Sequence, residues 1–119
     1  MHRLRPLLVL TLALGAFSAV AQQPTDPKGL LEYGIDLFGQ DRYREAIDSF
    51  GRILADPKAS AERPEAAYWS VLAYLASGDQ ATASASIEAF LSAYPTSPRV
   101  PDLLYQRGRI FYAKADYEG

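Results

Sequence analysis

The chain matches itself twice at an offset of 37 residues, and this internal repeat constrains its fold more than any other feature. Three prolines fall in register, followed by positions that are mostly apolar or small. The aligned sets include Pro27, Pro64 and Pro101; Leu30, Ala67 and Leu104; Leu31, Tyr68 and Tyr105; Gly34, Val71 and Gly108; and Leu37, Tyr74 and Phe111. Such a period is typical of repeat proteins, in which a unit cannot bury its apolar face alone and must stack on the next.

Each copy has the pattern of a helix, a short turn and a second helix. Proline suits a first helical turn, where its missing N–H costs little, and Asp26 before Pro27 is a predicted N-cap. The second helices are predicted over residues 42–55 and 80–93, with Asp41, Asp79 and Asp116 as candidate caps. Gly39 or Gly78 can take a left-handed conformation at the end of a first helix. The pattern predicts an all-α array of helical hairpins.

Small residues recur where the two helices of a hairpin should cross. Gly34 and Gly108 lie in the first helices, and we expect Ala46 and Ala83 to face them from the second helices. Without large side chains at these positions, the backbones can approach closely.

One segment carries a resemblance to a known family. Residues 72–79, LAYLASGD, are followed by Ala83, and this run resembles the inter-helix turn of tetratricopeptide repeats. The resemblance implies a right-handed helical-hairpin solenoid of about two and a half repeats of 37 residues. The repeats would span residues 27–63, 64–100 and, incompletely, 101–119. The unit is longer than the usual ~34 residues, and Val71 stands where the family prefers glycine.

The longer unit and residues 90–98, FLSAYPTSP, are similar to one subgroup of the family. That subgroup contains bacterial periplasmic Tol-Pal-associated coordinators of cell division and outer-membrane assembly lipoproteins with tetratricopeptide repeats. The resemblance implies an exported scaffold that binds a protein or peptide partner in the bacterial cell envelope. The alternative is an N-terminal structural fragment of a longer solenoid, with no independent activity.

Residues 1–21 have the pattern of a secretory signal peptide. Arg3 and Arg5 precede an apolar run over residues 7–17, and Ala19-Val20-Ala21 is a cleavage site of small residues. A linker over residues 22–26 then leads to a repeat domain over residues 27–119. The apolar run is shorter than a membrane span, so we expect no membrane insertion after cleavage. Since the chain contains no cysteine, and so no lipobox cysteine for a lipid anchor, the sequence predicts a periplasmic or secreted protein.

The residue types that most enzymes use are scarce. The single histidine, His2, lies in the predicted leader, and there is no cysteine. Beyond the leader, the chain therefore has no histidine to activate a nucleophile, and it lacks the cysteine and histidine ligands that usually bind zinc. The acidic residues fall on polar helix faces and caps, where solvated charge is the ordinary explanation. We therefore predict no enzyme, no catalytic residue, no cofactor and no metal site.

The charge balance argues against a nucleic-acid partner. Beyond the leader, ten basic residues face fourteen acidic ones, a net charge of −4. Binding to phosphates needs clustered lysine and arginine. A protein or peptide is therefore the expected partner.

The family resemblance implies a binding groove along the first helices of successive repeats. Tyrosine suits such a surface because it combines apolar area with a polar group, and Arg109 offers a fork for a carboxylate. The alternative is that many of these side chains pack between helices; Trp69, one position away, is predicted to do so. The predicted groove residues are Leu31, Ile35, Phe38, Tyr68, Leu72, Leu75, Tyr105, Arg109 and Tyr112.

The third copy stops where its second helix should begin. The helix over residues 101–115 therefore lacks the partner that would cover Leu104, Gly108 and Phe111. Repeat arrays normally end in a polar capping helix. We expect the chain alone to be marginally stable or to self-associate through this exposed helix.

Overall fold

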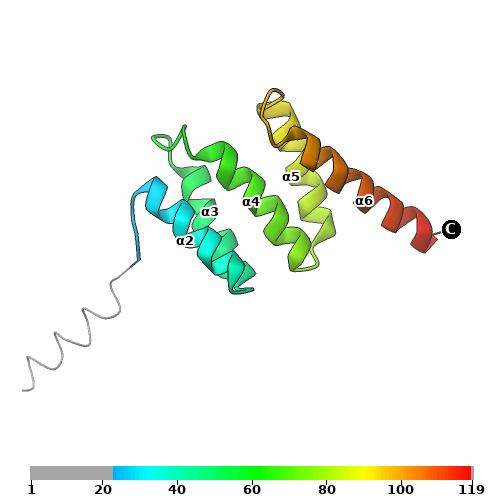
Figure 1. Ribbon diagram of the computed structural model, residues 1–119, viewed down its shortest axis with the longest axis horizontal. Coiled ribbons are helices and arrows are strands. Elements are labelled where there is room, and N and C mark those ends of the chain that lie inside the picture. The colour runs from blue at the N-terminus through cyan, green and yellow to red at the C-terminus, as the bar shows by residue number, and fades with distance from the viewer. Residues whose placement is uncertain (1–22, 119) are drawn as a thin grey trace, which may run out of the picture.

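The computed structural model describes residues 23–118, which form an all-α array (Figure 1). The predicted signal peptide lies outside the described residues. Successive helices pack against one another, so the predicted fold class, an all-α tetratricopeptide-like repeat, is confirmed. The helices are α2 (Pro27–Gly39), α3 (Tyr43–Ala55), α4 (Arg63–Ala76), α5 (Gln80–Ala93) and α6 (Val100–Glu118).

The repeated prolines mark the starts of α2, α4 and α6. Pro27 and Pro64 occupy the first helical turn, and Pro101 is the second residue of α6. The Asp26 carboxylate accepts a hydrogen bond from the Gly29 backbone N–H at 3.0 Å, which confirms the predicted N-cap. The periodic prolines therefore begin the same kind of helix three times.

The turns inside the two hairpins share a left-handed residue at the same repeat position. These residues are Asp41, with φ of 60°, and Gly78, with φ of 87°. The predicted glycine is therefore right in the second turn, whereas in the first turn the left-handed residue is Asp41 and not Gly39. Asparagine and aspartate are the side chains that best tolerate this conformation after glycine.

Of the three aspartates predicted to cap second helices, one does so and two do not. Asp79 caps α5 by accepting from the Thr82 backbone N–H at 3.1 Å. Asp41 does not cap α3, because its left-handed backbone directs the carboxylate to the Tyr43 hydroxyl, which donates to it at 2.8 Å. Asp116 lies inside α6, which continues to Glu118.

Two apolar clusters make up the core. The first joins α2, α3 and α4 around Leu37, Phe50 and Ile53, and the second joins α4, α5 and α6 around Ile87 and Leu103. Trp69 packs against both clusters, as expected for a residue between repeats. The clusters form one continuous stack along the array.

The crossing of α2 and α3 depends on a glycine, but its partner differs from the predicted alanine. A Cβ atom added at Gly34 would lie 2.9 Å from both Cδ1 and Cζ of Phe50. The ring of Phe50 is fully buried against this bare stretch of backbone. Ala46 and Ala83 are also fully buried, which agrees with small residues on the inner faces of α3 and α5.

Candidate functional site

A cavity of about 390 Å³ lies between the C-terminal ends of α2 and α4 and the middle of α6. It is lined by apolar side chains from all three helices and by two glutamines and one arginine. Four of the nine predicted groove residues are among its lining residues: Phe38, Leu72, Leu75 and Arg109. The others are Ala76, Gln80, Gln106, Ile110 and Ala113.

Local packing fixes the apolar wall. Phe38 lies edge-on to Tyr43 and Trp69, with ring centroids 5.3 Å apart in both pairs. Leu72 and Leu75 pack against the second core cluster and remain half-buried. These side chains are held by the core while one side of each stays accessible to a ligand.

The polar side of the cavity contains hydrogen-bond donors. Arg109 is exposed, its guanidinium carbon lies 6.0 Å from the Tyr105 ring centroid, and it forms no ion pair with any residue among 23–115. Gln80 and Gln106 provide amide groups beside it. Arginine donates in a planar fork that matches a carboxylate, so this edge can bind an acidic group.

The other predicted groove residues lie elsewhere. Leu31 and Ile35 pack against the first core cluster, and Tyr68 belongs to the second. Tyr105 and Tyr112 are 63% and 74% exposed on α6 and do not line the cavity. The structure thus brings four of the predicted residues together and leaves these five outside the cavity.

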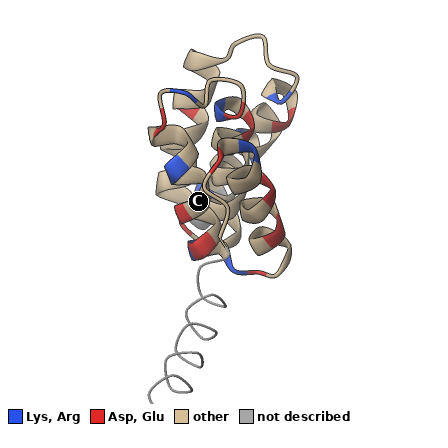
Figure 2. Ribbon diagram, turned by 90° about the vertical axis from the view of Figure 1, so that its left-hand side faces the viewer, with Lys and Arg blue, Asp and Glu red and all other residues tan. Residues whose placement is uncertain are grey.

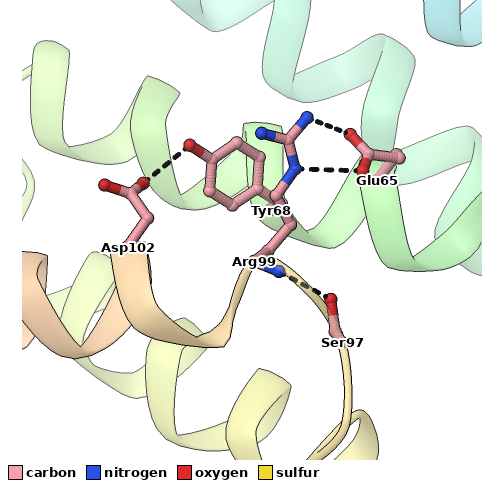
Figure 3. Close-up of polar contacts among 5 residues, drawn as sticks. All are labelled: Glu65, Tyr68, Ser97, Arg99 and Asp102. Atoms are coloured by element: carbon pink, nitrogen blue, oxygen red, sulfur yellow. Dashed lines mark hydrogen bonds and ion pairs between the residues drawn. The ribbon is translucent and has the colours of Figure 1, made fainter.

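A polar cluster joins α4 to the start of α6 (Figure 3). Nε and a terminal nitrogen of Arg99 donate to the two carboxylate oxygens of Glu65 at 3.0 and 2.9 Å. The guanidinium lies 4.2 Å from the centroid of the Tyr68 ring, and the Tyr68 hydroxyl donates to Asp102 at 2.6 Å. The Arg99 backbone N–H donates to the Ser97 hydroxyl oxygen at 3.1 Å. These contacts fix the N-terminal end of α6, and therefore the wall of the cavity that α6 supplies.

The cluster was not predicted from the sequence, although its spacing contains a signal. Glu65 and Arg99 are 34 residues apart, and so are Tyr68 and Asp102. Equal separations place both pairs across the same boundary between two repeats. A search for complementary polar pairs one repeat apart would have found them.

The hydroxyl of Tyr68 gives a pH-dependent prediction. Burial, together with the hydrogen bond to Asp102, raises its pKa from 10.0 to about 12. The folded state therefore favours the protonated phenol. The stability that the protonated Tyr68 hydroxyl contributes is fully present below pH 10.0, and it is lost as the pH rises towards 12. A Tyr68→Phe variant should be less stable than the natural chain at neutral pH, by about 1.5–3 kcal/mol for a hydrogen bond to a charged group.

Urea denaturation of both chains over this alkaline range provides the measurement. The stability difference should shrink as the pH rises, because the phenol of the natural chain ionises. A difference that stays constant from pH 10.0 to about 12 would contradict the role of this hydrogen bond.

A second cavity, of about 810 Å³, separates α5 from the C-terminal half of α6. Small residues of α5, among them Ala81, Ser84 and Ala85, form one side. Ile110 and Ala113 line both cavities. The C-terminal half of α6 therefore diverges from α5, as Figure 1 shows.

Figure 2 shows basic and acidic residues interspersed on the helices at the end of the array that faces the viewer. Among the side chains that the structure describes, those of residues 23–115, no group of three or more histidine, cysteine, aspartate or glutamate residues could hold a metal ion. None of the described helices α2 to α6 has the length and apolar character that a membrane span requires.

Comparison with known families decides where the chain belongs. The model of the family YfiO, described as outer membrane lipoprotein, matches residues 24–118. The chain belongs to the YfiO family. This membership confirms the predicted tetratricopeptide-type relationship. A comparison with curated proteins finds no match.

The YfiO match corrects the predicted localisation. The prediction of a periplasmic or secreted protein without a lipid anchor is wrong, because the family is one of outer membrane lipoproteins. That prediction relied on an export leader and on the lack of cysteine. A leader indicates that a chain is exported, but it does not determine where the exported chain resides.

Proposed function

We propose that this chain is a non-catalytic scaffold that takes part in outer-membrane assembly by binding a segment of a partner protein. The cavity between α2, α4 and α6 carries the proposal, because it combines apolar side chains from three helices with an arginine. Membership of an outer membrane lipoprotein family supports a role in the bacterial envelope.

The lining residues suggest what the ligand looks like. Phe38, Leu72 and Leu75 would take an apolar side chain, and Arg109 would bind a carboxylate close to it. Gln80 and Gln106 could hydrogen-bond to the peptide backbone on either side. A cavity of about 390 Å³ fits one or two side chains of a longer segment. The preferred ligand is therefore an extended peptide with an acidic residue next to a large apolar one.

A non-catalytic role is supported by the residue types present. The single histidine lies at position 2, and the chain has no cysteine. The polar side chains lining the cavity are those of two glutamines and an arginine. Such groups bind and orient a ligand, but they include no base near neutral pH.

The test is a binding measurement with matched peptides. Short unstructured peptides with phenylalanine beside aspartate would be compared with the same peptides containing asparagine instead, using fluorescence anisotropy. The aspartate peptides should bind more tightly by about tenfold or more, as expected for a charge-assisted hydrogen bond of about 1.5–3 kcal/mol. An Arg109→Gln variant should remove this preference.

Arg44→Gln is the matched control, because Arg44 is also exposed but lies on α3, outside the cavity. It makes the same change in net charge and should keep the preference for aspartate. If both variants lost the preference equally, the effect would be one of overall charge, and the cavity would not be the binding site.

A further inference from the structure

A space of about 280 Å³, which we call the crevice, is lined by α3, α4 and α5. It lies between the two complete hairpins, α2–α3 and α4–α5. Ala67 and Tyr74 of α4 line the crevice, whereas Leu72 and Leu75 of the same helix line the cavity described above. No residue lines both spaces, so the crevice is a separate surface on another side of α4.

The charged side chains of α3 and α5 lie away from the crevice. On α3, Arg44, Asp48 and Arg52 line a different cavity. On α5, the single charged residue is Glu88, which pairs with Arg107 of α6 at 3.2 Å. Among residues 23–115, none of the side chains that line the crevice is charged. A ligand is therefore expected to be uncharged where it enters, because burying an unpaired charge is costly.

The wall that α3 supplies is apolar and accessible. Leu54 is 39% exposed, and Ile47 is half-buried. Gly51 lies between them, and a Cβ atom added there would meet nothing within 4 Å. These three residues are four and three positions apart, so they share one side of α3. They leave apolar surface uncovered beside the buried ring of Phe90.

Two tyrosines lie at opposite ends of the crevice. Tyr74 is near the end of α4, and Tyr94 follows the last residue of α5. The turn over residues 77–79 joins the end of α4 to the start of α5, so the ends of these two helices are far apart. Both side chains are half-buried, and within residues 23–115 neither hydroxyl has a hydrogen-bond partner. Each tyrosine can therefore offer a ring and a hydroxyl donor to a ligand.

The length of the crevice matches one turn of a polyproline II helix. Ala67 and Tyr74 both line it and are seven residues apart, which is about 10 Å along α4. The prolines of a Pro-x-x-Pro sequence are about 9 Å apart in this conformation, which rises about 3.1 Å per residue. Its carbonyl groups form no internal hydrogen bonds and can accept from hydroxyls. Proline also brings no backbone N–H into an apolar site.

Other kinds of ligand fit this surface less well. An amphipathic helix docks through a row of apolar anchors over several turns, whereas about 280 Å³ holds one or two side chains. An acidic or basic peptide would find no charged partner among the lining residues. Proline-rich segments, in contrast, typically dock in grooves lined by aromatic side chains.

We propose that the crevice binds a proline-rich segment of a partner protein in the polyproline II conformation. The two prolines of a Pro-x-x-Pro sequence lie beside Tyr74 and Tyr94, and the two hydroxyls donate to carbonyl groups of the segment. Both the surface and the ligand differ from those of the cavity between α2, α4 and α6. The proposal therefore goes beyond the proposed function and does not depend on it.

The probe is a capped, uncharged synthetic peptide that contains Pro-Ala-Ala-Pro, labelled for fluorescence anisotropy and added to the full chain. One matched peptide has alanine in place of both prolines, and another has one further alanine between the prolines. The Pro-Ala-Ala-Pro peptide should bind more tightly than either by about tenfold or more, because only its prolines are both rigidly held and correctly spaced.

Glycine variants of the full chain locate the binding. Gly51→Leu fills part of the crevice and should weaken binding of the Pro-Ala-Ala-Pro peptide by about tenfold or more. Its thermal unfolding midpoint should not fall, because the position is open. Gly108→Leu is the matched control, since Gly108 lies in α6, has nothing within 4 Å of an added Cβ and does not line the crevice. It should leave binding unchanged.

Tyrosine variants test the two hydroxyl donors. Tyr74→Phe and Tyr94→Phe each keep the ring and should weaken binding by about two- to tenfold, as expected for one lost hydrogen bond. Their thermal unfolding midpoints should stay the same, because these hydroxyls have no partner among residues 23–115. Tyr105→Phe is the control, since Tyr105 is 63% exposed on α6 and does not line the crevice.

Four results would overturn the proposal. The first is that the Pro-Ala-Ala-Pro peptide does not bind, and the second is that the alanine peptide binds equally well. The third is binding that Gly51→Leu does not weaken, which would place the peptide elsewhere. The fourth is a dimer in sedimentation velocity that Gly51→Leu dissociates, because the occupant would then be a second copy of this chain. None of them alters the effect of Arg109→Gln on the cavity, so the two proposals can fail separately.

Discussion

Replacing Gly34 with leucine is expected to lower the free energy of unfolding by about 3 kcal/mol, the upper end of the usual cost of overpacking. Even a Cβ atom at this position would lie 2.9 Å from two atoms of the Phe50 ring. The ring is fully buried, so it cannot move away without disturbing the first core cluster. Urea denaturation followed by circular dichroism would measure the loss.

Gly108→Leu is the matched comparison at the same repeat position. Because nothing lies within 4 Å of an added Cβ at Gly108, the variant should be as stable as the natural chain or slightly more stable. Removing a glycine from a helix interior gains about 0.5–1 kcal/mol. Equal losses in the two variants would mean that Gly34 is not a close-packing position.

Replacing Phe50 with alanine is expected to cost about 3–5 kcal/mol, the usual range for truncating a buried phenylalanine. Phe50 is 0% exposed and belongs to the cluster that holds α2, α3 and α4 together. Calorimetric or urea unfolding would show the loss. A cost below about 1 kcal/mol would indicate that the ring is not part of a packed core.

The two substitutions should also compensate for each other. A leucine at position 34 can occupy part of the space that the Phe50 ring leaves, so the double variant should lose less stability than the sum of the single variants. Residues in direct contact commonly show coupling of about 0.5–3 kcal/mol. Additive losses would contradict direct packing of Gly34 on Phe50.

The periodic part of the fold could be predicted from the sequence. The prolines and the apolar spacing predicted helices over residues 42–55 and 80–93, and the structure has them at Tyr43–Ala55 and Gln80–Ala93. Such features depend on neighbours three or four residues away along the chain, which a sequence displays directly. The Asp26 and Asp79 caps were predictable for the same reason.

Features set by backbone conformation or by contacts between repeats were harder to predict. Aspartate is a residue type that often caps helices, but the left-handed backbone of Asp41 turns its side chain towards Tyr43. Facing residues in the first hairpin depend on the exact rotation of two helices, and Gly34 meets Phe50 where Ala46 was expected. The C-terminal ends of α2 and α4 and the middle of α6 form the cavity, so its shape depends on how far α6 tilts away from α5.

The residues of the candidate site also differ in how well they could be predicted. The tetratricopeptide resemblance implied groove positions at Phe38, Leu72 and Leu75, and these residues do line one cavity with Arg109. Tyr68 was also a predicted groove residue and lies four residues before Leu72 on α4, yet Arg99 and Asp102 hold it in the core. The family resemblance indicated which side of the helices to consider, whereas contacts one repeat away determine which side chains remain accessible.

The binding cavity is tested most directly by nuclear magnetic resonance, with the isotope-labelled chain titrated with a peptide containing phenylalanine beside aspartate. The amide signals that shift should belong to the ends of α2 and α4 and the middle of α6, around Phe38, Leu75 and Arg109. Shifts that are absent, or that are confined to α3 or to the exposed Leu104 and Phe111 of α6, would contradict a binding site between α2, α4 and α6.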